Sequence, residues 1–184
     1  MEEVPIRPAA TVILVRDGAS GLETLLLRRA SSLVFHGGAW VFPGGRLDED
    51  DYVGAEVPAE ARDPRHEPAA RRGAVREAYE EAGLRLEPEA LIPYSHWTTP
   101  LGRPRRFATW FYLAEATAAP VTVDGGEITA HRWLTPTAAL DLREAGEIDL
   151  APPTLFTLAR LADHATAAAA VHDARTAEYQ TFAP

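Results

Sequence analysis

The chain has 184 residues, a net charge of −9 and no cysteine, with 46% hydrophobic and 24% charged residues. This length and composition predict one soluble globular domain over residues 1–184, with a sizeable core. The negative charge argues against nucleic acid or an anionic membrane as the main partner, because both are negatively charged themselves. The absence of cysteine excludes disulfides, thiolate catalysis and cysteine zinc sites.

The sequence also lacks signals for export or membrane insertion. Its first residues do not have the pattern of a signal peptide, and no apolar run approaches the length of a membrane span. We therefore expect a cytoplasmic protein.

The first half of the chain predicts a set of strands followed by an irregular excursion. Alternating or β-branched patterns bounded by turn residues predict strands at residues 9–15, 23–28 and 39–42. Residues 48–72 are rich in Asp, Glu, Pro and Ala with little periodicity, which indicates an excursion with a short helix near residues 58–62.

The second half alternates helices and strands. We expect a helix at residues 69–82, strands at 107–114 and 130–134, a helix from the N-cap Thr135 to about residue 144, and a last helix at about 154–170. Strands first, an acidic helix between them and helices later are typical of an α/β sandwich.

Residues 76–84 are the most informative segment, with the sequence Arg-Glu-Ala-Tyr-Glu-Glu-Ala-Gly-Leu. On a helix, Glu77, Glu80 and Glu81 share one face, because residues three and four positions apart are neighbours. Like charges at this spacing repel, and Arg76 offers one positive partner, which leaves two negative charges unmatched. A hard divalent cation would neutralise them, since such ions take carboxylate oxygens as ligands. An ordinary solvated acidic face is the alternative.

A glycine loop upstream favours the metal interpretation. Phe42-Pro43-Gly44-Gly45 ends an apolar stretch, and adjacent glycines let the backbone turn sharply and approach a ligand closely. Freed carbonyls in such a loop are suitable metal ligands.

Together, the loop and the helix resemble the Nudix box, G-x5-E-x7-R-E-U-x-E-E-x-G-U, in which U is apolar. Gly45 and residues 76–84 fit the motif, but Asp51 stands where the box has its first glutamate. Residues 52–75 then separate Asp51 from Arg76, where the box has seven residues. The resemblance implies a Nudix fold, a mixed β-sheet between helices. Its core would span about residues 9–150, with an insertion at about 52–72 and an extra C-terminal helical segment at about 152–175.

Insertions inside the box occur in a subgroup that resembles the peroxisomal coenzyme A diphosphatases. That subgroup tends to carry W-x-T-P followed by R-F-x-T-x-F, and this chain has W-T-T-P at residues 97–100 and R-F-A-T-W-F at residues 106–111. Coenzyme A-cleaving members also tend to carry L-L-T-x-R-[SA]-x3-R-x3-G-x3-F-P-G-G. Residues 25–45 keep this spacing, but Leu27 replaces the Thr and Val34 replaces the second Arg. Arg28, Arg29 or His36 would have to replace that guanidinium.

The resemblance assigns roles to the box residues. Mg²⁺ or Mn²⁺ would be held by the Gly45 carbonyl, Glu77, Glu80 and Glu81. Glu77 would be a ligand or would orient the attacking water, and Arg76 would hold a glutamate rotamer.

Further residues have two open interpretations each. Glu127, in Asp-Gly-Gly-Glu at residues 124–127, would be a further ligand or the catalytic base, or else a surface acid. Asp48 and Asp51 would reach the site or cap the loop. The predicted substrate-binding residues hold phosphates or stack on adenine, or else belong to solvated loops and the core. They are Arg28, Arg29, Trp97, Arg103, Arg105 and Arg106, with Trp110 and Tyr112 as further aromatic candidates.

The implied reaction is metal-dependent hydrolysis of X-diphosphate-Y to X-phosphate and phosphate-Y, in which metal ions lower the pKa of water and a glutamate takes its proton. The predicted substrate is coenzyme A or an acyl derivative, followed by ADP-ribose or a dinucleotide such as NADH. A non-catalytic Nudix-like ligand sensor and an acidic-helix interaction domain are the rivals. The expected partner is a small diphosphate molecule, without nucleic acid or membrane, and a homodimer stays an open alternative.

Overall fold

The computed structural model describes residues 4–32 and 37–183. In this part of the chain one mixed sheet has the strand order β3-β2-β1-β6-β5-β8, with β4 added to β1 and β7 added to β2. The strands are β1 (Ile6–Gly18), β2 (Gly21–Arg29), β3 (Trp40–Val41), β4 (Gly44–Arg46), β5 (Ile92–Thr98), β6 (Arg106–Glu115), β7 (Ile128–Leu134) and β8 (Gln180–Phe182).

Strand β1 organises this sheet. Its first half pairs antiparallel with β4, its last residues pair antiparallel with β2, and β6 runs parallel to it along most of its length. The pairing of β1 with β4 brings the Gly44-Gly45 loop against the centre of the sheet, where it faces the acidic helix.

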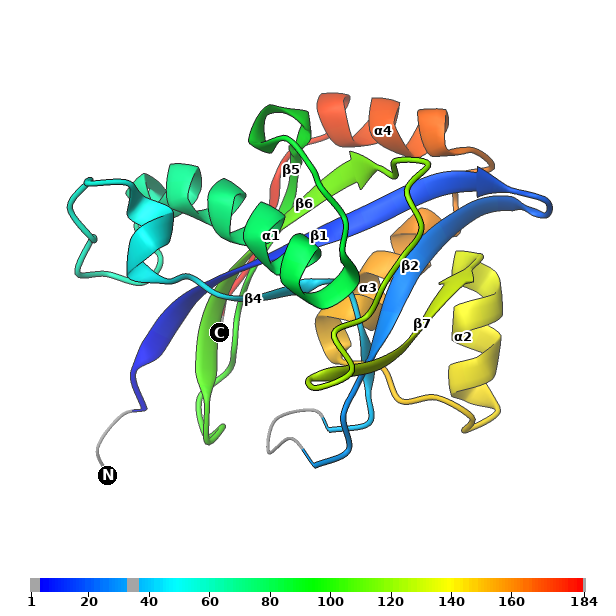
Figure 1. The fold of residues 1–184 in the computed structure, drawn as a ribbon, viewed down its shortest axis with the longest axis horizontal. Coiled ribbons are helices and arrows are strands. Elements are labelled where there is room, and N and C mark those ends of the chain that lie inside the picture. Colours follow the sequence, from blue (N-terminus) through cyan, green and yellow to red (C-terminus); the bar gives the residue numbers. More distant parts are fainter. Residues whose placement is uncertain (1–3, 33–36, 184) are drawn as a thin grey trace.

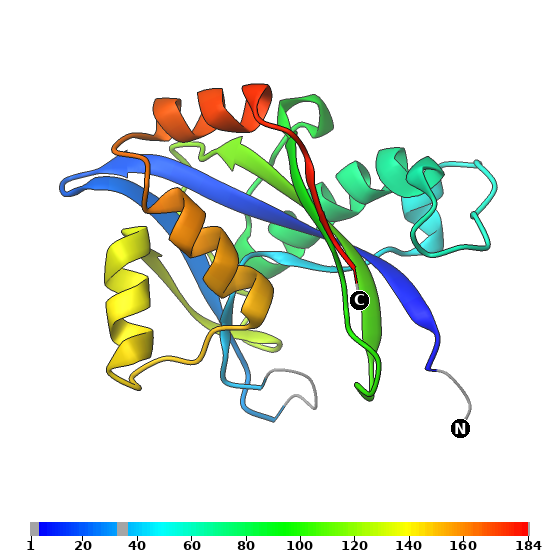
Figure 2. The same ribbon diagram turned by 180° about the vertical axis from the view of Figure 1, so that it is seen from behind.

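Helices cover both faces of the sheet (Figures 1 and 2). Helix α1 (Glu67–Ala82) lies on one face, while α2 (Pro136–Glu144), α3 (Pro152–Leu161) and α4 (Ala167–Thr176) lie on the other. Successive residues of β1 point to opposite faces, so Val12 and Leu14 enter the α1 core while Ile13 and Val15 enter the other core. The predicted α/β sandwich is therefore confirmed. None of the helices in the described ranges is both long and apolar enough to span a membrane.

The predicted last helix is wrong in its extent, because the chain forms two helices there. The alanine-rich sequence has a high helix propensity, but α3 ends at Leu161 and Thr166 caps a new helix by accepting a hydrogen bond from the Ala169 N–H at 3.2 Å. The break is held by the β1–β2 hairpin, since the Ala165 carbonyl accepts from the Leu22 N–H at 3.2 Å. With the break, both helices pack apolar faces on the sheet.

Other differences lie in short elements. The helix expected near residues 58–62 is absent, and two 3-10 turns, η1 (Glu49–Tyr52) and η2 (Pro64–His66), form instead. Strands β4, β5 and β8 were not predicted. The glycines of β4 and the polar residues of β5 lack a strand-like pattern, and both segments become strands through pairing with β1 and β6.

Candidate active site

The helix α1 carries the acidic motif in its C-terminal half and ends at Gly83, which has the left-handed φ of 69° that favours glycine. Small residues on its buried face let it pack closely against β1 and β4. Gly73 is a point of close contact, because a Cβ there would meet Leu47 Cδ2 and come within 3.0 Å of Asp51 Oδ2. A glycine inside a helix costs about 1 kcal/mol relative to alanine, and here it allows the segment before the insertion to contact α1.

Glu81 is the buried member of the acidic motif, with 6% of its surface exposed. Its Oε2 accepts a hydrogen bond from the Gly44 N–H at 2.9 Å. Burial raises the pKa of Glu81 to about 8; the Gly44 N–H and Arg29 oppose this rise, whereas Glu77 and Glu127 add to it. The net rise shows that the surrounding protein compensates this buried charge incompletely, which is the situation that a bound cation corrects.

Glu77 lies beside the second glycine of the loop. A Cβ on Gly45 would overlap the Glu77 carboxylate, so glycine at this position is what allows the close approach. Burial raises the pKa of Glu77, and the neighbouring Arg76 opposes the rise. The Gly45 backbone and a half-buried carboxylate therefore lie side by side.

Arg76 joins the acidic residues in a network. Its Nη1 donates to Glu77 Oε1 at 2.9 Å and to Glu80 Oε2 at 3.0 Å. Its Nε and Nη2 donate to the two carboxylate oxygens of Asp51 at 3.2 and 3.0 Å, and Nη2 also donates to the Arg46 carbonyl. Arg76 thus pairs with two glutamates rather than one, and a third acid holds its other edge.

Asp51 combines the two interpretations proposed for it. It caps the loop, since the Asp48 N–H donates to its Oδ2 at 2.9 Å, and it also reaches the site through Arg76. Its side chain is 4% exposed, whereas Asp48 lies 3.6 Å from Arg76 with half of its side chain exposed.

The charges of Arg29 and Glu127 both act on the pKa of Glu81, Arg29 lowering it and Glu127 raising it. Arg29 Nη2 is 3.9 Å from Glu127 Oε2, and the side chain of Glu127 is 66% exposed. Arg29 Nε is buried and has no hydrogen-bond partner among the described residues. A guanidinium with an unused donor is suited to bind a phosphate oxygen.

The chemistry of this site fits a divalent cation, although its carboxylates are not arranged around one. Within residues 4–32 and 37–183, no three His, Asp or Glu side chains converge in a geometry ready to hold a metal. Arg76 binds Glu77 and Glu80, and the Gly44 N–H binds Glu81. The donors are nevertheless carboxylates and a carbonyl, the ligands of Mg²⁺ and Mn²⁺, and the raised pKa values of Glu77 and Glu81 show where a positive charge would be stabilised.

A sequence model of the NUDIX domain matches residues 5–154. The chain belongs to the Nudix family. Acyl-coenzyme A diphosphatase NUDT19 of Xenopus laevis is 25% identical over 85% of this chain and 64% of its own length. The protein of the same name from Gallus gallus is 34% identical over 65% of this chain and 35% of its own length. The chain thus spans less than two thirds of each of these relatives.

The crystal structure of a NUDIX hydrolase from Alicyclobacillus acidocaldarius shares the fold. It superposes with a TM-score of 0.79 at 24% identity and covers 98% of this chain and 99% of that one. This likeness supports the Nudix fold, and with it the sandwich in which α1 is the helix of the Nudix box.

Several predicted substrate-binding residues lie away from the Nudix helix. Trp97 stacks on Phe182 at 3.9 Å and contacts the core on the opposite face of the sheet. Arg28 is exposed at the end of β2, where the pairing with β7 is irregular. Arg106 is buried, and its Nε donates to the Thr99 carbonyl at 3.2 Å. Of these candidates the structure brings Arg29 beside Glu127, whereas Trp97 and Arg106 have partners elsewhere.

The remaining candidates are exposed or structural. Arg103 and Arg105 are exposed on the turn between β5 and β6. Trp110 and Tyr112 are buried in the α1 core, as their core interpretation predicts. Val34 and His36 lie outside the described residues.

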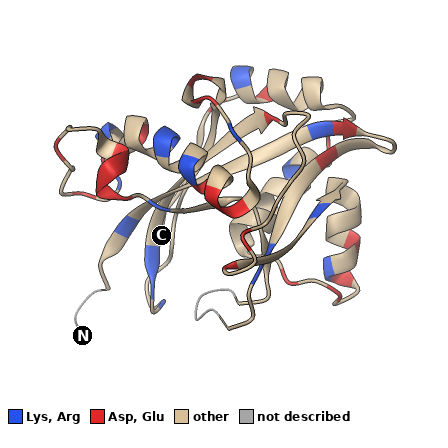
Figure 3. Cartoon of the chain, viewed as in Figure 1, with Lys and Arg blue, Asp and Glu red and all other residues tan. Residues whose placement is uncertain are grey.

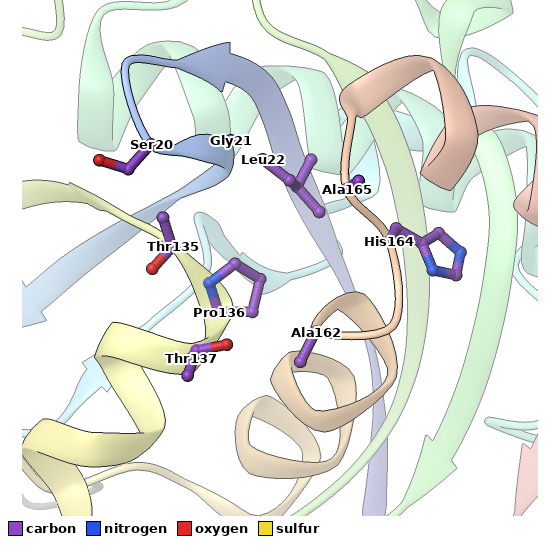
Figure 4. Close-up of a pocket in the computed structure, with 9 residues that line it drawn as sticks. All are labelled: Ser20, Gly21, Leu22, Thr135, Pro136, Thr137, Ala162, His164 and Ala165. Atoms are coloured by element: carbon purple, nitrogen blue, oxygen red, sulfur yellow. The ribbon is translucent and has the colours of Figure 1, made fainter.

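The Nudix carboxylates do not line the hollow shown in Figure 4. That hollow lies between the β1–β2 turn, the start of α2 and the α3–α4 connection, and Thr135 and His164 are among its lining residues. In Figure 3 the acidic residues of the motif lie toward the C-terminal end of α1, after its arginines.

Sequence reasoning missed two features of the site. Gly73 makes room for Asp51, and the Gly44 N–H fixes Glu81. A glycine in the middle of a helical pattern is the signal that points to a close contact such as that of Gly73.

Proposed function

We propose that this chain is a divalent-metal-dependent hydrolase that cleaves a diphosphate linkage, with coenzyme A or acyl-coenzyme A as the first substrate class. The observation that carries the proposal is the buried, incompletely compensated carboxylate of Glu81 beside Glu77 and the Gly44-Gly45 loop. Nudix hydrolases generally use Mg²⁺ or Mn²⁺. The names of the frog and chicken relatives support the substrate class.

The Nudix helix and the glycine loop would hold the metal through Glu77, Glu80, Glu81 and the Gly45 carbonyl. When bound, the metal supplies positive charge to the phosphate oxygens and a water of lowered pKa. The Gly44 N–H orients Glu81, and Asp51 would keep Arg76 anchored if Glu77 and Glu80 held the metal in place of its guanidinium.

In the reaction a water oxygen attacks one phosphorus, and the bond from that phosphorus to the bridging oxygen breaks. The electron pair of the broken bond stays on the leaving phosphate, and the proton of the water passes to a carboxylate. Glu127 is our candidate for this base because it is exposed, lies on a loop beside Arg29 and its charge acts on the pKa of Glu81. Glu77 is the alternative.

Arg29 is the candidate that binds the substrate phosphates, since its Nε is buried without a partner among the described residues. The exposed Arg103 and Arg105 are candidates for a more distant phosphate, such as the one on the ribose of coenzyme A. ADP-ribose lacks that phosphate and is the runner-up substrate, together with dinucleotides.

The test is turnover by metal-stripped protein with and without added Mg²⁺ or Mn²⁺. Coenzyme A, dephospho-coenzyme A, ADP-ribose and NADH would be offered separately, and mass spectrometry would identify the two phosphate products. We expect no turnover until the metal is added. Full activity in excess chelator would reject the metal site, and saturable binding without any cleavage would favour the ligand sensor.

A further inference from the structure

The loop between β6 and β7 carries Glu127 beside Arg29. Figure 1 shows it passing the C-terminal end of α1 before β7 begins. The Thr122 N–H donates to the Ala82 carbonyl at 2.9 Å, and the Ala30 N–H donates to the Glu127 carbonyl at 2.7 Å. The loop is therefore attached at one end to the Nudix helix and at the other to the end of β2.

Between these attachments, Asp124 holds the backbone of the loop. Its Oδ2 accepts hydrogen bonds from the N–H groups of Gly126 at 3.3 Å and Glu127 at 2.9 Å, and its Oδ1 accepts from Ile128 at 2.8 Å. Gly125 has a left-handed φ of 74° and its N–H donates to the Ile128 carbonyl, which closes the turn. One carboxylate thus binds the backbone of Glu127 and of the residues on both sides of it.

The hydrogen bonds of Asp124 show that it holds the loop backbone and is not directed at a substrate. Asp124 is exposed, and its hydrogen bonds go to its own loop. Slight burial acts to raise the pKa of Asp124, but the N–H groups of Glu127, Ile128 and Gly126 outweigh it and the net pKa is lowered. The carboxylate is therefore ionised and able to accept these bonds at neutral pH.

We propose that Asp124 is a positioning residue for Glu127, holding the loop so that the Glu127 carboxylate stays beside Arg29. This inference rests on the proposed function, because it assumes that Glu127 takes part in the hydrolysis. Without the Asp124 carboxylate the loop keeps its two outer attachments but loses three of the hydrogen bonds that hold the backbone around Glu127.

A double-mutant cycle with Asp124→Ala and Glu127→Gln tests the proposal. If Asp124 acts through Glu127, each single variant lowers kcat by about tenfold or more while KM changes little. The double variant then loses no more than the worse single variant, within the roughly twofold scatter of additivity. Asp124→Asn keeps an oxygen that accepts backbone N–H bonds, so its kcat should lie closer to wild type than that of Asp124→Ala.

The matched control is Asp63→Ala. Asp63 accepts a hydrogen bond from the Arg65 N–H at 2.9 Å in the turn before α1, the same kind of side chain to backbone bond at a distance from Glu127. We expect kcat of Asp63→Ala to match wild type. A loss like that of Asp124→Ala would mean that any weakened turn lowers activity, and would overturn the proposal.

Hydrogen exchange of the amides of residues 126–128 gives a readout that needs no turnover. These amides should lose protection in Asp124→Ala and keep it in Asp63→Ala. Unchanged protection, unchanged kcat, or losses that multiply in the double variant would each overturn the proposal. If wild-type protein cleaves none of the diphosphates, the proposed function falls, and amide exchange alone decides whether Asp124 holds the loop.

Discussion

The carboxylate of Asp51 binds the guanidinium of Arg76 through both oxygens, although the two residues are 25 positions apart in the chain. In the Nudix box the corresponding acid precedes the arginine by only eight positions. The insertion therefore does not keep Asp51 and Arg76 apart, because the chain after it returns Arg76 to Asp51. Arg76 keeps one edge on Asp51 and turns the other toward Glu77 and Glu80.

Replacing Asp51 tests whether this pair supports the site. Asp51→Asn should lower the free energy of unfolding by about 1–3 kcal/mol, because the half-buried Arg76 loses a charged partner, and kcat should fall with it. Asp48→Asn is the control, since Asp48 is half exposed and lies 3.6 Å from Arg76. Its free energy of unfolding should change by less than about 1 kcal/mol. Denaturant unfolding and turnover would be measured for both. Equal effects would show that Arg76 is not held by Asp51.

Gly73→Ala tests whether helix propensity or overpacking decides the sign of the change in the free energy of unfolding. Helix propensity alone predicts a gain of about 1 kcal/mol. The contacts of a new Cβ with Leu47 and Asp51 predict a loss, which for overpacking is about 1–3 kcal/mol. We expect a lower free energy of unfolding, measured by urea unfolding, and a lower kcat, measured by turnover. Ala169→Gly, at an exposed position of α4, calibrates propensity alone. A stabilised Gly73→Ala protein would contradict the close contact.

Glu81→Gln and Glu80→Gln should differ in metal-free protein. A carboxyl group whose folded pKa is raised contributes stability that is complete below the unfolded value of about 4.5 and is lost as the pH rises through about 8. At pH 9 in chelator, Glu81→Gln should therefore melt at a higher temperature than wild type. Glu80 is half exposed and paired with Arg76, so Glu80→Gln should be nearly neutral.

Turnover should separate these two residues from an ordinary surface glutamate. Both Glu80→Gln and Glu81→Gln should lower kcat by at least about a hundredfold, because each removes a ligand charge. Glu144→Gln, at an exposed end of α2 on the other face of the sheet, should leave kcat unchanged. Activity of Glu80→Gln close to wild type would remove Glu80 from the metal site.

His96 should make the protein sensitive to acid. Burial and the charge of Arg62 lower its pKa to about 4, and its ring packs edge-on against Trp110 at 4.5 Å. A histidine with a lowered folded pKa contributes stability above the unfolded value of about 6.5 and loses it as the pH falls toward 4. Between pH 7 and pH 4 the free energy of unfolding should fall less in His96→Phe than in wild type, by up to about 3 kcal/mol. His172 is exposed, so His172→Gln should leave the pH dependence of the unfolding free energy unchanged.

Local sequence determined the elements whose signals lie within a few residues. The three glutamates share one face of α1 because helical spacing requires it, and the adjacent glycines of β4 allow the close approach that the metal interpretation needed. The alternation in β1 likewise divides its side chains between two cores. The Nudix motif, the sandwich and the acidic residues of the candidate site could be predicted from these patterns.

Tertiary structure decided which of these groups are paired, buried or brought together. Arg76 finds Asp51 across the insertion, Glu81 becomes the buried acid while Glu80 stays exposed, and Trp97 joins the core of the opposite face. The break between α3 and α4 has the same origin, because it is held by the β1–β2 hairpin. Burial and long-range pairing depend on residues far apart in the chain, and local spacing contains no information about their distances.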